Sequence, residues 1–231
     1  MKLTSENLAI FGKGKTGSKV IEVIKGKYGF NPTIFDSVNV PSSSSLEKIK
    51  YVIAFVPSEI LNVYLHLFIE NKITLVSGAT GQNWDEKIIE KIKEAELQWI
   101  TGSNFSIGMR VVFQMIKVLE KAKTIWPSID INIHEVHHVK KLDGPSGTAL
   151  SWAQWIGLLD TNKVTFEREG DVVGDHQLTF STGSEKITLR HEALDRKLFA
   201  EGAVFALEYL IQNNLNDGLH YFEDITKNQL T

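Results

Sequence analysis

The chain has 231 residues, a formal net charge of −3 and no cysteine. Its 42% hydrophobic and 23% charged residues are typical of a globular protein with one large domain or two small ones. The small net charge gives no argument for nucleic-acid or membrane partners, and the absence of cysteine excludes disulfides and thiolate metal sites. Because the N-terminus lacks a signal-peptide core and no apolar run approaches the ~20 residues of a membrane span, we expect a cytoplasmic protein.

The first forty residues predict a dinucleotide-binding unit. The apolar run Leu8–Phe11 stops at a glycine-rich loop, Gly12–Gly17, after which apolar residues recur at helical spacing. A second apolar run ends at Asp36, 19 residues after the last glycine. This order of strand, G-x-G-x-x-G loop, helix and acid lets the backbone approach a pyrophosphate while the acid accepts ribose hydroxyls. The cofactor-binding candidates are Gly12, Lys13, Gly14, Lys15, Thr16, Gly17 and Asp36.

A phosphate-binding P-loop is the competing interpretation of the same residues, because Gly14-Lys15-Thr16 matches the end of that motif. The motif needs its first glycine five residues earlier, where Ala9 stands inside the predicted strand. The following apolar strand, Tyr51–Val56, also ends at a proline and not at the aspartate that such proteins place there. The sequence therefore favours the dinucleotide loop.

Strands and helices alternate as far as residue 104, which predicts a parallel sheet with right-handed crossovers. Ligands bind such sheets at the carboxyl ends of the strands, so the loops after two later strands join the glycine loop at one edge. These loops add Gly78, Ala79, Thr80, Asn104 and Phe105 to the cofactor-binding candidates. We expect the strands at Leu8–Phe11, Thr33–Phe35, Tyr51–Val56, Ile73–Ser77 and Leu97–Ile100, and helices at Glu59–Asn71 and Trp84–Glu96.

The pattern changes after residue 104, where three strand-like runs follow one another without an intervening helix and predict an antiparallel or mixed sheet. The expected fold class is α/β, a Rossmann-type parallel-sheet domain plus an α+β domain with a mixed sheet. We place a dinucleotide-binding domain at residues 1–104 and 205–231, and a substrate-binding and oligomerisation domain at 105–204. The expected elements are helices Met109–Ala122, Ser146–Leu159 and Phe199–Gln212, and strands Ile129–Val136, Lys163–Glu169, Asp175–Ser181 and Glu185–Ala193.

The stretch Glu135–Leu150 carries the most chemistry, and it reads E-V-H-H-V-K-K-L-D-G-P-S-G-T-A-L. Histidine and lysine can carry protons near neutral pH, and the helix start at Ser146-Gly147-Thr148 offers unpaired amides to an anion. If the strand continues past Val136, His137 and Lys141 return to the same side and form the better catalytic pair, with His138 on the other side. The competing interpretation is a basic surface hairpin without a ligand.

The same stretch contains a literal H-E-x-x-H motif between His134 and His138, which would bind zinc if it lay on a helix. The preceding residues alternate with period two and predict a strand, where the two histidines would lie ~13 Å apart. That separation is too large for one metal ion, so we expect no metal site.

The motif in Glu135–Ala149 resembles E-x-H-H-x-x-K-x-D-x-P-S-G-T-A, the signature of the dihydrodipicolinate reductase family, now called 4-hydroxy-tetrahydrodipicolinate reductase. The resemblance extends along essentially the whole chain in the family's order. The other matching segments are Gly78-Ala-Thr-Gly81, Asn104-Phe-Ser-Ile-Gly108, Arg168-Glu-Gly170 with Gly174-x-His176, and the run from His191 to Ala203.

The resemblance implies an enzyme that reduces a cyclic imine dicarboxylate of the diaminopimelate route to lysine with NADH or NADPH. It implies that His137 is the general acid, that Lys141 is a second proton donor and anion contact, and that His138, Gly147 and Thr148 hold the carboxylates. It also implies a homotetramer built through the second-domain sheet. Two alternatives stay open: a dehydrogenase of another carboxylated substrate, and a non-catalytic protein that senses nucleotides.

The sequence departs from the family pattern in several places. Gly144 replaces the usual alanine, Ala79 breaks the G-T-T-G loop, and the chain is short between Asp36 and Tyr51. Ser37 stands where NADPH-dependent relatives often have an arginine, and Asp36 would repel a 2′-phosphate. We therefore expect NADH to be preferred over NADPH, although Lys13 and Lys15 reduce that repulsion.

Overall fold

The computed structural model describes residues 2–126, 128–213 and 215–230, which form two compact units. The first unit contains Met1–Ser106 and Arg196–Thr231, and the second contains Ile107–Asp195. Residues 196–204, which we expected in the second domain, group with the first unit because they begin a single long helix that packs on its sheet.

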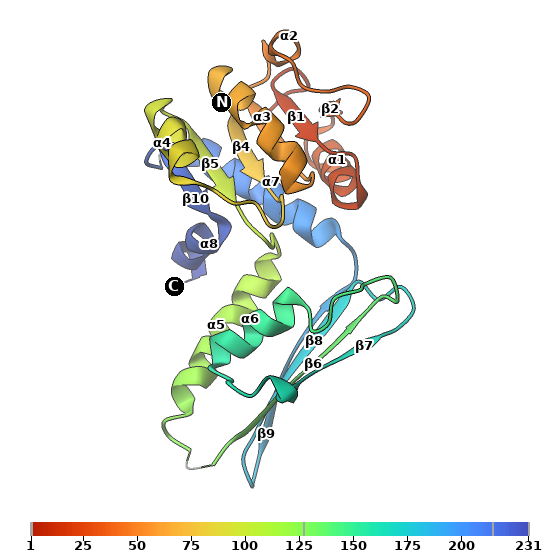
Figure 1. Ribbon diagram of the computed structural model, residues 1–231, viewed down its shortest axis with the longest axis vertical. Coiled ribbons are helices and arrows are strands. Elements are labelled where there is room, and N and C mark those ends of the chain that lie inside the picture. The colour runs from red at the N-terminus through yellow and green to blue at the C-terminus, as the bar shows by residue number, and fades with distance from the viewer. Residues whose placement is uncertain (1, 127, 214, 231) are drawn as a thin grey trace. The chain divides into compact units, whose positions relative to one another are not determined.

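The first unit is built on a six-stranded sheet whose pairings are all parallel (Figure 1). The strand order is β10-β5-β4-β3-β1-β2, so the chain moves outward from the centre in both directions, as in Rossmann-type folds. The strands are β1 (Leu8–Phe11), β2 (Thr33–Phe35), β3 (Tyr51–Ala54), β4 (Thr74–Ser77), β5 (Gln98–Thr101) and β10 (Gly218–Tyr221). The expected parallel sheet is confirmed.

Helices cover both faces of this sheet, which explains why its strands are apolar on both sides. One face packs against α1 (Lys15–Tyr28), α7 (Lys197–Gln212) and α8 (Phe222–Leu230). The other face packs against α2 (Ser43–Leu46), α3 (Ser58–Glu70) and α4 (Glu86–Glu94). Asp85 caps α4 by accepting a hydrogen bond from the Ile88 amide, which sets the start of that helix two residues later than Trp84.

The last strand and the last helix were not predicted from the sequence. Strand β10 pairs in parallel with β5, with Gly218 opposite Gln98, and it forms an edge of the sheet. The side chain of Gln98 donates to the carbonyl of Leu215, and the Gly218 amide donates to that of Leu97, so the C-terminal segment is attached to β5. A four-residue strand with only one side chain from the usual strand formers gives no readable alternation.

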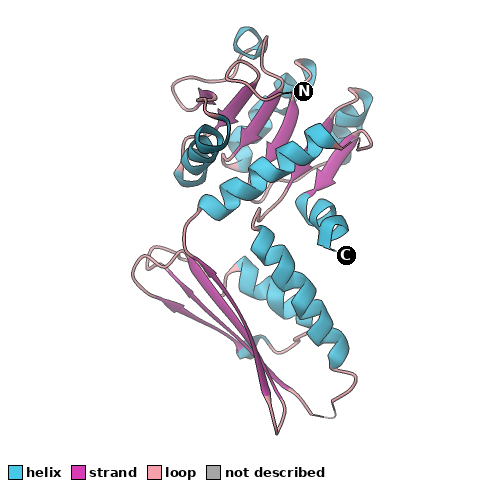
Figure 2. Cartoon of the chain, turned by 180° about the vertical axis from the view of Figure 1, so that it is seen from behind, coloured by secondary structure: helices cyan, strands magenta, loops and turns pink. Residues whose placement is uncertain are grey.

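The second unit has a four-stranded mixed sheet in the order β7-β6-β8-β9. Strands β6 and β7 are parallel, whereas β6–β8 and β8–β9 are antiparallel, so the expected mixed sheet is confirmed. Two helices lie along one face of this sheet, as Figure 2 shows. The elements are α5 (Ile107–Ala122), β6 (Asp130–His137), α6 (Gly147–Ile156), the 3₁₀ turn η1 (Thr161–Lys163), β7 (Val164–Arg168), β8 (Gly174–Ser181) and β9 (Lys186–Ala193).

The face of β6 that the helices cover changes from apolar to polar along the strand. Ile131 and Ile133 are buried in the core with Trp152 of α6. The next two residues at the same period are Glu135 and His137, which are also buried. The helix-covered face therefore ends in charged and titratable groups, and these groups form the site described below.

No helix in the described part of the chain is long and apolar enough to cross a membrane.

The close packing of α7 allows us to predict how a substitution in this helix changes the free energy of unfolding. A Cβ atom on Gly202 would lie 1.7 Å from the carbonyl oxygen of Phe105, so no side chain fits there without moving backbone. We expect Gly202→Ala to destabilise the first unit by about 1–3 kcal/mol, because overpacking forces the backbone to shift. The matched control is Gly26→Ala in α1, where a Cβ meets nothing within 4 Å and alanine should stabilise the helix by about 1 kcal/mol. Urea unfolding measures both, and equal stability of the two variants would contradict this account.

Candidate functional site

The glycine loop between β1 and α1 has the geometry that its sequence predicts. Gly12 has a φ of +102°, and a Cβ on it would lie 2.4 Å from the carbonyl oxygen of Phe55. A Cβ on Gly17 would lie 1.8 Å from the Gly12 oxygen, so the turn and the start of α1 can close only around glycine. Gly14 is the N-cap, it has no side-chain cap, and a Cβ there meets nothing within 4 Å. The loop thus leaves open space in front of the first-turn amides of α1, where an anion is stabilised.

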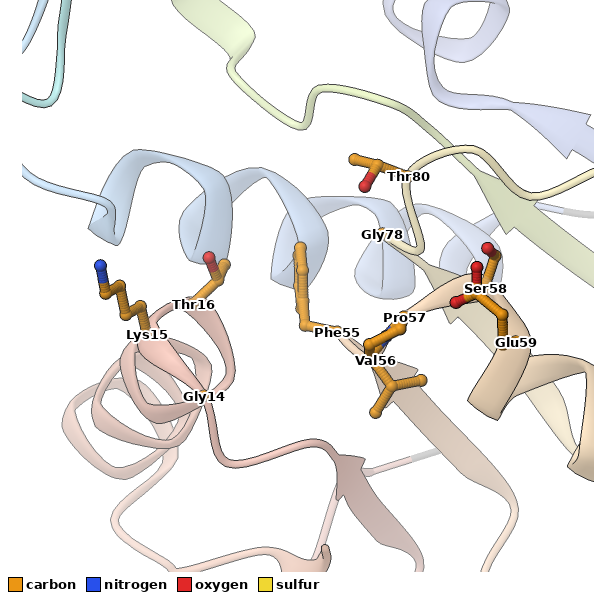
Figure 3. Close-up of a pocket in the computed structure, with 10 residues that line it drawn as sticks. All are labelled: Gly14, Lys15, Thr16, Phe55, Val56, Pro57, Ser58, Glu59, Gly78 and Thr80. Carbon is orange, nitrogen blue, oxygen red and sulfur yellow. The ribbon is translucent and has the colours of Figure 1, made fainter. Parts of the chain in front are cut away.

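A cavity of about 490 Å³ lies at this loop (Figure 3). Lys15 and Thr16 line it from the first turn of α1, and Gly78 and Thr80 line it from the loop after β4. These two loops follow strands β1 and β4 at the carboxyl edge of the sheet, as the sequence predicts.

A second cavity of about 510 Å³ continues from the same loop towards the end of β2. Lys13 and Asp36 line it together with the apolar side chains of Val40, Ile60 and Val63. One carboxylate oxygen of Asp36 accepts hydrogen bonds from the amides of Asn39 and Val38, which lower the pKa of Asp36. The cavity therefore combines an ionised acid with an apolar wall, which suits a ribose joined to a flat heterocycle.

The remaining cofactor candidates have other contacts. Phe105 is buried, with 1% of its surface exposed, and packs on Phe222 with ring centroids 4.7 Å apart. The side chain of Asn104 accepts a hydrogen bond from the Ser106 amide and stabilises the turn before α5. Ala79 is also buried, and its amide donates to Ser77 Oγ. Their contact with a cofactor stays a prediction, whereas these packing and turn contacts are present in the structure.

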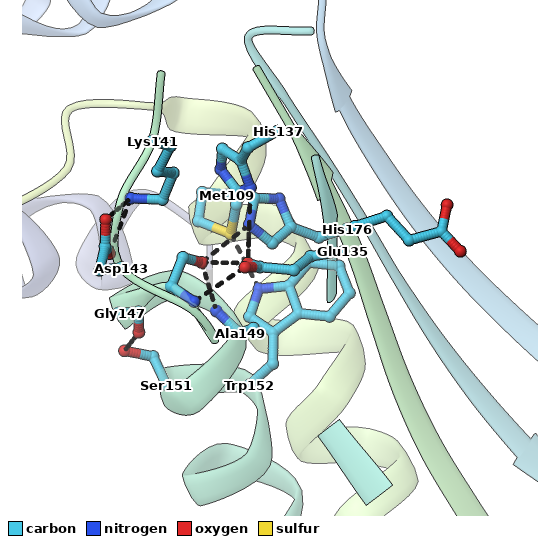
Figure 4. A network of polar contacts seen from close by, with 12 residues as sticks. Met109, Glu135, His137, Lys141, Asp143, Gly147, Ala149, Ser151, Trp152 and His176 are labelled. Carbon is cyan, nitrogen blue, oxygen red and sulfur yellow. Dashed lines mark hydrogen bonds and ion pairs between the residues drawn. The ribbon is translucent and has the colours of Figure 1, made fainter. Parts of the chain in front are cut away.

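In the second unit, polar contacts gather around Glu135, whose side chain is fully buried (Figure 4). One carboxylate oxygen accepts from the Ser146 amide at 2.8 Å, and the other accepts from the Ser146 hydroxyl. Three cationic or titratable groups complete the shell at 3.4–3.6 Å: His176 Nε2, Arg168 Nη2 and His137 Nδ1.

Sheet register places these groups together although they are far apart in sequence. Glu135 of β6 lies opposite His176 of β8, and His137 lies opposite Arg168 of β7. Ser146 arrives from the helix side, because it is the N-cap of α6, and its hydroxyl also accepts a hydrogen bond from the Ala149 amide. The carboxylate thus joins three strands to the start of a helix.

The groups around Glu135 and His137 shift the pKa values of both side chains. Burial raises the pKa of Glu135, but the contacts with His176 and Ser146 outweigh burial and lower it to about 2. Burial lowers the pKa of His137 to about 4; Glu135 opposes that shift, while His176, Lys141 and Arg168 add to it. At neutral pH without a ligand, Glu135 is therefore an anion and His137 a neutral imidazole.

Lys141 is not placed as the strand pattern predicts. Strand β6 ends at His137, and residues 138–141 turn, with the Lys141 amide donating to the carbonyl of His138. The expectation that His137 and Lys141 share one side of a continuing strand is therefore wrong. The half-buried Lys141 binds both carboxylate oxygens of Asp143 at 2.8 Å. Arg168 holds this turn by donating to the carbonyls of Lys141 and Asp143.

The predicted carboxylate-binding residues divide into two groups. Ser146 is 3% exposed, and both of its donors are directed at Glu135, so it holds the helix start in place. Gly147 and Thr148 follow in the first turn of α6, where helix geometry leaves amides without an intrahelical partner. The half-buried His138 lies just past the end of β6, and its buried Nδ1 has no hydrogen-bond partner among the residues that the structure describes.

The zinc-protease interpretation of H-E-x-x-H is not supported, because His134 lies on strand β6 and bonds the hydroxyl of Thr165. A different set, Glu135, His137 and His176, has ligand atoms within 4.8 Å of one another and is close enough to hold a metal ion. Both oxygens of Glu135 already accept hydrogen bonds from Ser146, so we interpret this set as a hydrogen-bonded network.

Sequence reasoning assigned no role to Glu135, Arg168 or His176, although all three stand in segments that resemble the family. The available signal was the period of β6. Every second residue of β6 points inward, and this series runs from Ile131 and Ile133 to Glu135. A charged side chain at such a core position needs hydrogen-bonding or charged partners. Those partners come from β7, β8 and the N-cap of α6, which the sequence alone could not bring into register.

Comparisons with known proteins identify the family of this chain. The sequence model of the family described as "Dihydrodipicolinate reductase, C-terminus" matches residues 108–225. A 4-hydroxy-tetrahydrodipicolinate reductase of Wolbachia pipientis wMel is 31% identical, and the match covers 96% of this chain and 91% of the relative. One of Pelagibacter ubique is 29% identical over 95% of this chain and 97% of its own.

A solved structure shares the fold. Dipicolinate-bound dihydrodipicolinate reductase from Paenisporosarcina sp. TG-14 aligns with a TM-score of 0.71 and 22% sequence identity, covering 96% of this chain and all of that one. The family match over half of the chain and the near full-length relatives lead to one conclusion: the chain belongs to the dihydrodipicolinate reductase family, also named 4-hydroxy-tetrahydrodipicolinate reductase.

Proposed function

We propose that this chain reduces 4-hydroxy-tetrahydrodipicolinate to tetrahydrodipicolinate in the diaminopimelate route to lysine, with a hydride from a reduced nicotinamide dinucleotide, one proton, and release of the 4-hydroxyl group as water. Family membership supports the reaction, and the dipicolinate bound to the related structure supports a dicarboxylate substrate. The observation that carries the proposal is the site around Glu135, where an imidazole, an ammonium group and a helix N-terminus stand together.

The first unit would hold the cofactor, which supplies a hydride when bound. The open first turn of α1 after Gly14 fits a pyrophosphate, and the acid and apolar wall of the second cavity fit an adenosine. Thr80, Asn104 and Phe105 would position the nicotinamide end. The absence of a side chain at Gly14 leaves the approach to the α1 amides clear.

The second unit would hold the substrate. A dicarboxylate needs several donors or cations, and the amides of Gly147 and Thr148, the imidazole of His138 and the ammonium group of Lys141 supply them. Lys141 would exchange its contact with Asp143 for a substrate carboxylate. Ser146 would act by fixing the helix start through Glu135.

The reduction also requires a proton, and His137 would donate it. Because its pKa is lowered to about 4, His137 is neutral in the ligand-free chain above that pH. A bound dianion favours the imidazolium and raises this pKa, so the proton would be taken up with the substrate. Lys141 is the second candidate donor, because its charge acts on the His137 imidazole and it lies on the turn that Arg168 holds.

Two substitutions test these assignments. We expect His137→Gln and Lys141→Ala each to lower kcat by about 100-fold or more, because a positioned proton donor contributes that much. The NADH dissociation constant should stay unchanged, since the nucleotide candidates lie in the first unit. Lys140→Ala, an exposed neighbour, is the matched control and should keep the parent activity. Loss of NADH binding in either variant would contradict the division of roles.

We further propose that NADH is preferred over NADPH. Hydrogen bonds to the carboxylate of Asp36 lower its pKa and keep it ionised, so it would accept ribose hydroxyls and repel a 2′-phosphate. We expect kcat/KM to be at least about tenfold higher with NADH, which corresponds to about 1.4 kcal/mol. Asp36→Asn should reduce this ratio, and a preference of the parent chain for NADPH would refute the proposal.

We also propose a homotetramer assembled through the sheet of the second unit. The face of this sheet that α5 and α6 do not cover presents polar side chains, among them Asp175 and Arg190, which form a bidentate ion pair between β8 and β9. Such a face is suited to pairing with a symmetry-related copy. Light scattering should give about four times the chain mass of 26.0 kDa, and a monomer mass would contradict the proposal.

A further inference from the structure

We propose that Glu135 is the positioning residue that couples the proton donor to the carboxylate-binding helix start. The inference rests on the proposed function, because it concerns how the two parts of that site act together. Glu135 does not need to touch the substrate for this role. It acts through His137 on one side and through Ser146 on the other.

The contact with the helix is the stronger of the two. Glu135 accepts hydrogen bonds from both the amide and the hydroxyl of Ser146, one on each carboxylate oxygen. The Ser146 hydroxyl in turn accepts from Ala149, so the first turn of α6 is fixed by a chain of bonds that starts on β6. The amides of Gly147 and Thr148 therefore keep a set direction relative to the strand that carries His137.

The contact with the imidazole is electrostatic. Nδ1 of His137 lies 3.6 Å from Glu135 and, within the described residues, has no hydrogen-bond partner, although His137 is only 8% exposed. The other charged or titratable groups that face this ring are His176 of β8, Arg168 of β7 and Lys141 of the following turn. All three disfavour the imidazolium, so Glu135 is the anion that favours protonation of this ring.

Arg168 connects Glu135 to the turn that carries Lys141. Its guanidinium lies 3.5 Å from Glu135 and also donates to the carbonyls of Lys141 and Asp143. The carboxylate of Glu135 thus influences both candidate proton donors. It acts on His137 directly through space, and it acts on Lys141 through Arg168, which bonds the backbone carbonyl of Lys141. A purely structural cap for α6 would need only an acceptor for Ser146, which a neutral amide side chain also provides.

Two variants separate the effect of the negative charge of Glu135 from the effect of its side-chain length. Glu135→Gln keeps the length but removes the charge, so the imidazolium in the substrate complex should be less stable. We expect kcat to fall about 10- to 100-fold, and the high-pH limb of the kcat profile to move to lower pH by about one unit or more. Glu135→Asp keeps the charge but is too short to hold Ser146, so KM for the substrate should rise about tenfold with a nearly unchanged pH profile.

The controls are a variant that removes a carboxylate outside the site and a measurement of NADH affinity. Glu167→Gln removes an exposed carboxylate on β7, next to Arg168, and should leave kcat, KM and the pH profile unchanged. NADH affinity, measured by fluorescence, should be the same in all variants, because it reports the first unit. Ser146→Ala covers the case in which Glu135→Gln does not fold, since it loses one bond to Glu135 and keeps the charge. It should raise KM without moving the pH profile.

The outcomes distinguish this inference from the function on which it rests. If His137→Gln retains the parent turnover, the assignment of the proton donor fails. If His137→Gln is inactive but Glu135→Gln shows the parent pH profile, Glu135 is a structural cap only and the inference is overturned. If Glu135→Gln does not fold, a Ser146→Ala variant with the parent KM, or with a shifted pH profile, overturns it equally.

Discussion

The second unit depends on keeping one fully buried carboxylate ionised. Moving a charged group from water into an apolar environment is costly unless partners replace its hydration. Glu135 continues the buried face that begins with Ile131 and Ile133, so its carboxylate lies where the strand pattern calls for an apolar side chain. Two donors from Ser146 and cationic or titratable groups from β7 and β8 meet this demand. The sheet register, the start of α6 and the turn held by Arg168 are arranged around this single requirement.

The first unit meets a different requirement, that of bringing backbone segments close together while the first-turn amides of α1 stay open. Its glycine loop contributes shape and open amides, because Gly12 and Gly17 permit contacts that any Cβ atom would block. Charge enters at Lys13 and Lys15 of the loop and at Asp36, where two amides of the following turn hold one carboxylate oxygen. The proposed function assigns the nucleotide to the backbone surface of the first unit and a small anion to the titratable side chains of the second.

The parts of this structure that sequence reasoning predicted are those encoded by local patterns. The glycine loop and the alternation of strands and helices need only neighbours in the chain, so the parallel sheet and its functional edge were predictable. Strand β10 was missed because four residues at a sheet edge carry little pattern. Lys141 was misplaced because the alternation was extended past His137, where the chain turns. The role of Glu135 depends on His137 of the same strand and on Ser146, Arg168 and His176, which are 11, 33 and 41 residues away. Only the register of three strands and a helix cap brings these distant partners together.

The division of the chain has a consequence for its synthesis. The second unit, Ile107–Asp195, is inserted between two segments of the first, and α7 supplies one wall of the first unit's core. While the ribosome makes the second unit, the strands β1 to β5 already exist but one of their faces still lacks that helix. Proteins expose apolar surface under such conditions, and nascent chains then attract chaperones or associate with one another. The insertion would therefore favour completion of the second unit before the first, although the first segment of the first unit precedes it in the chain.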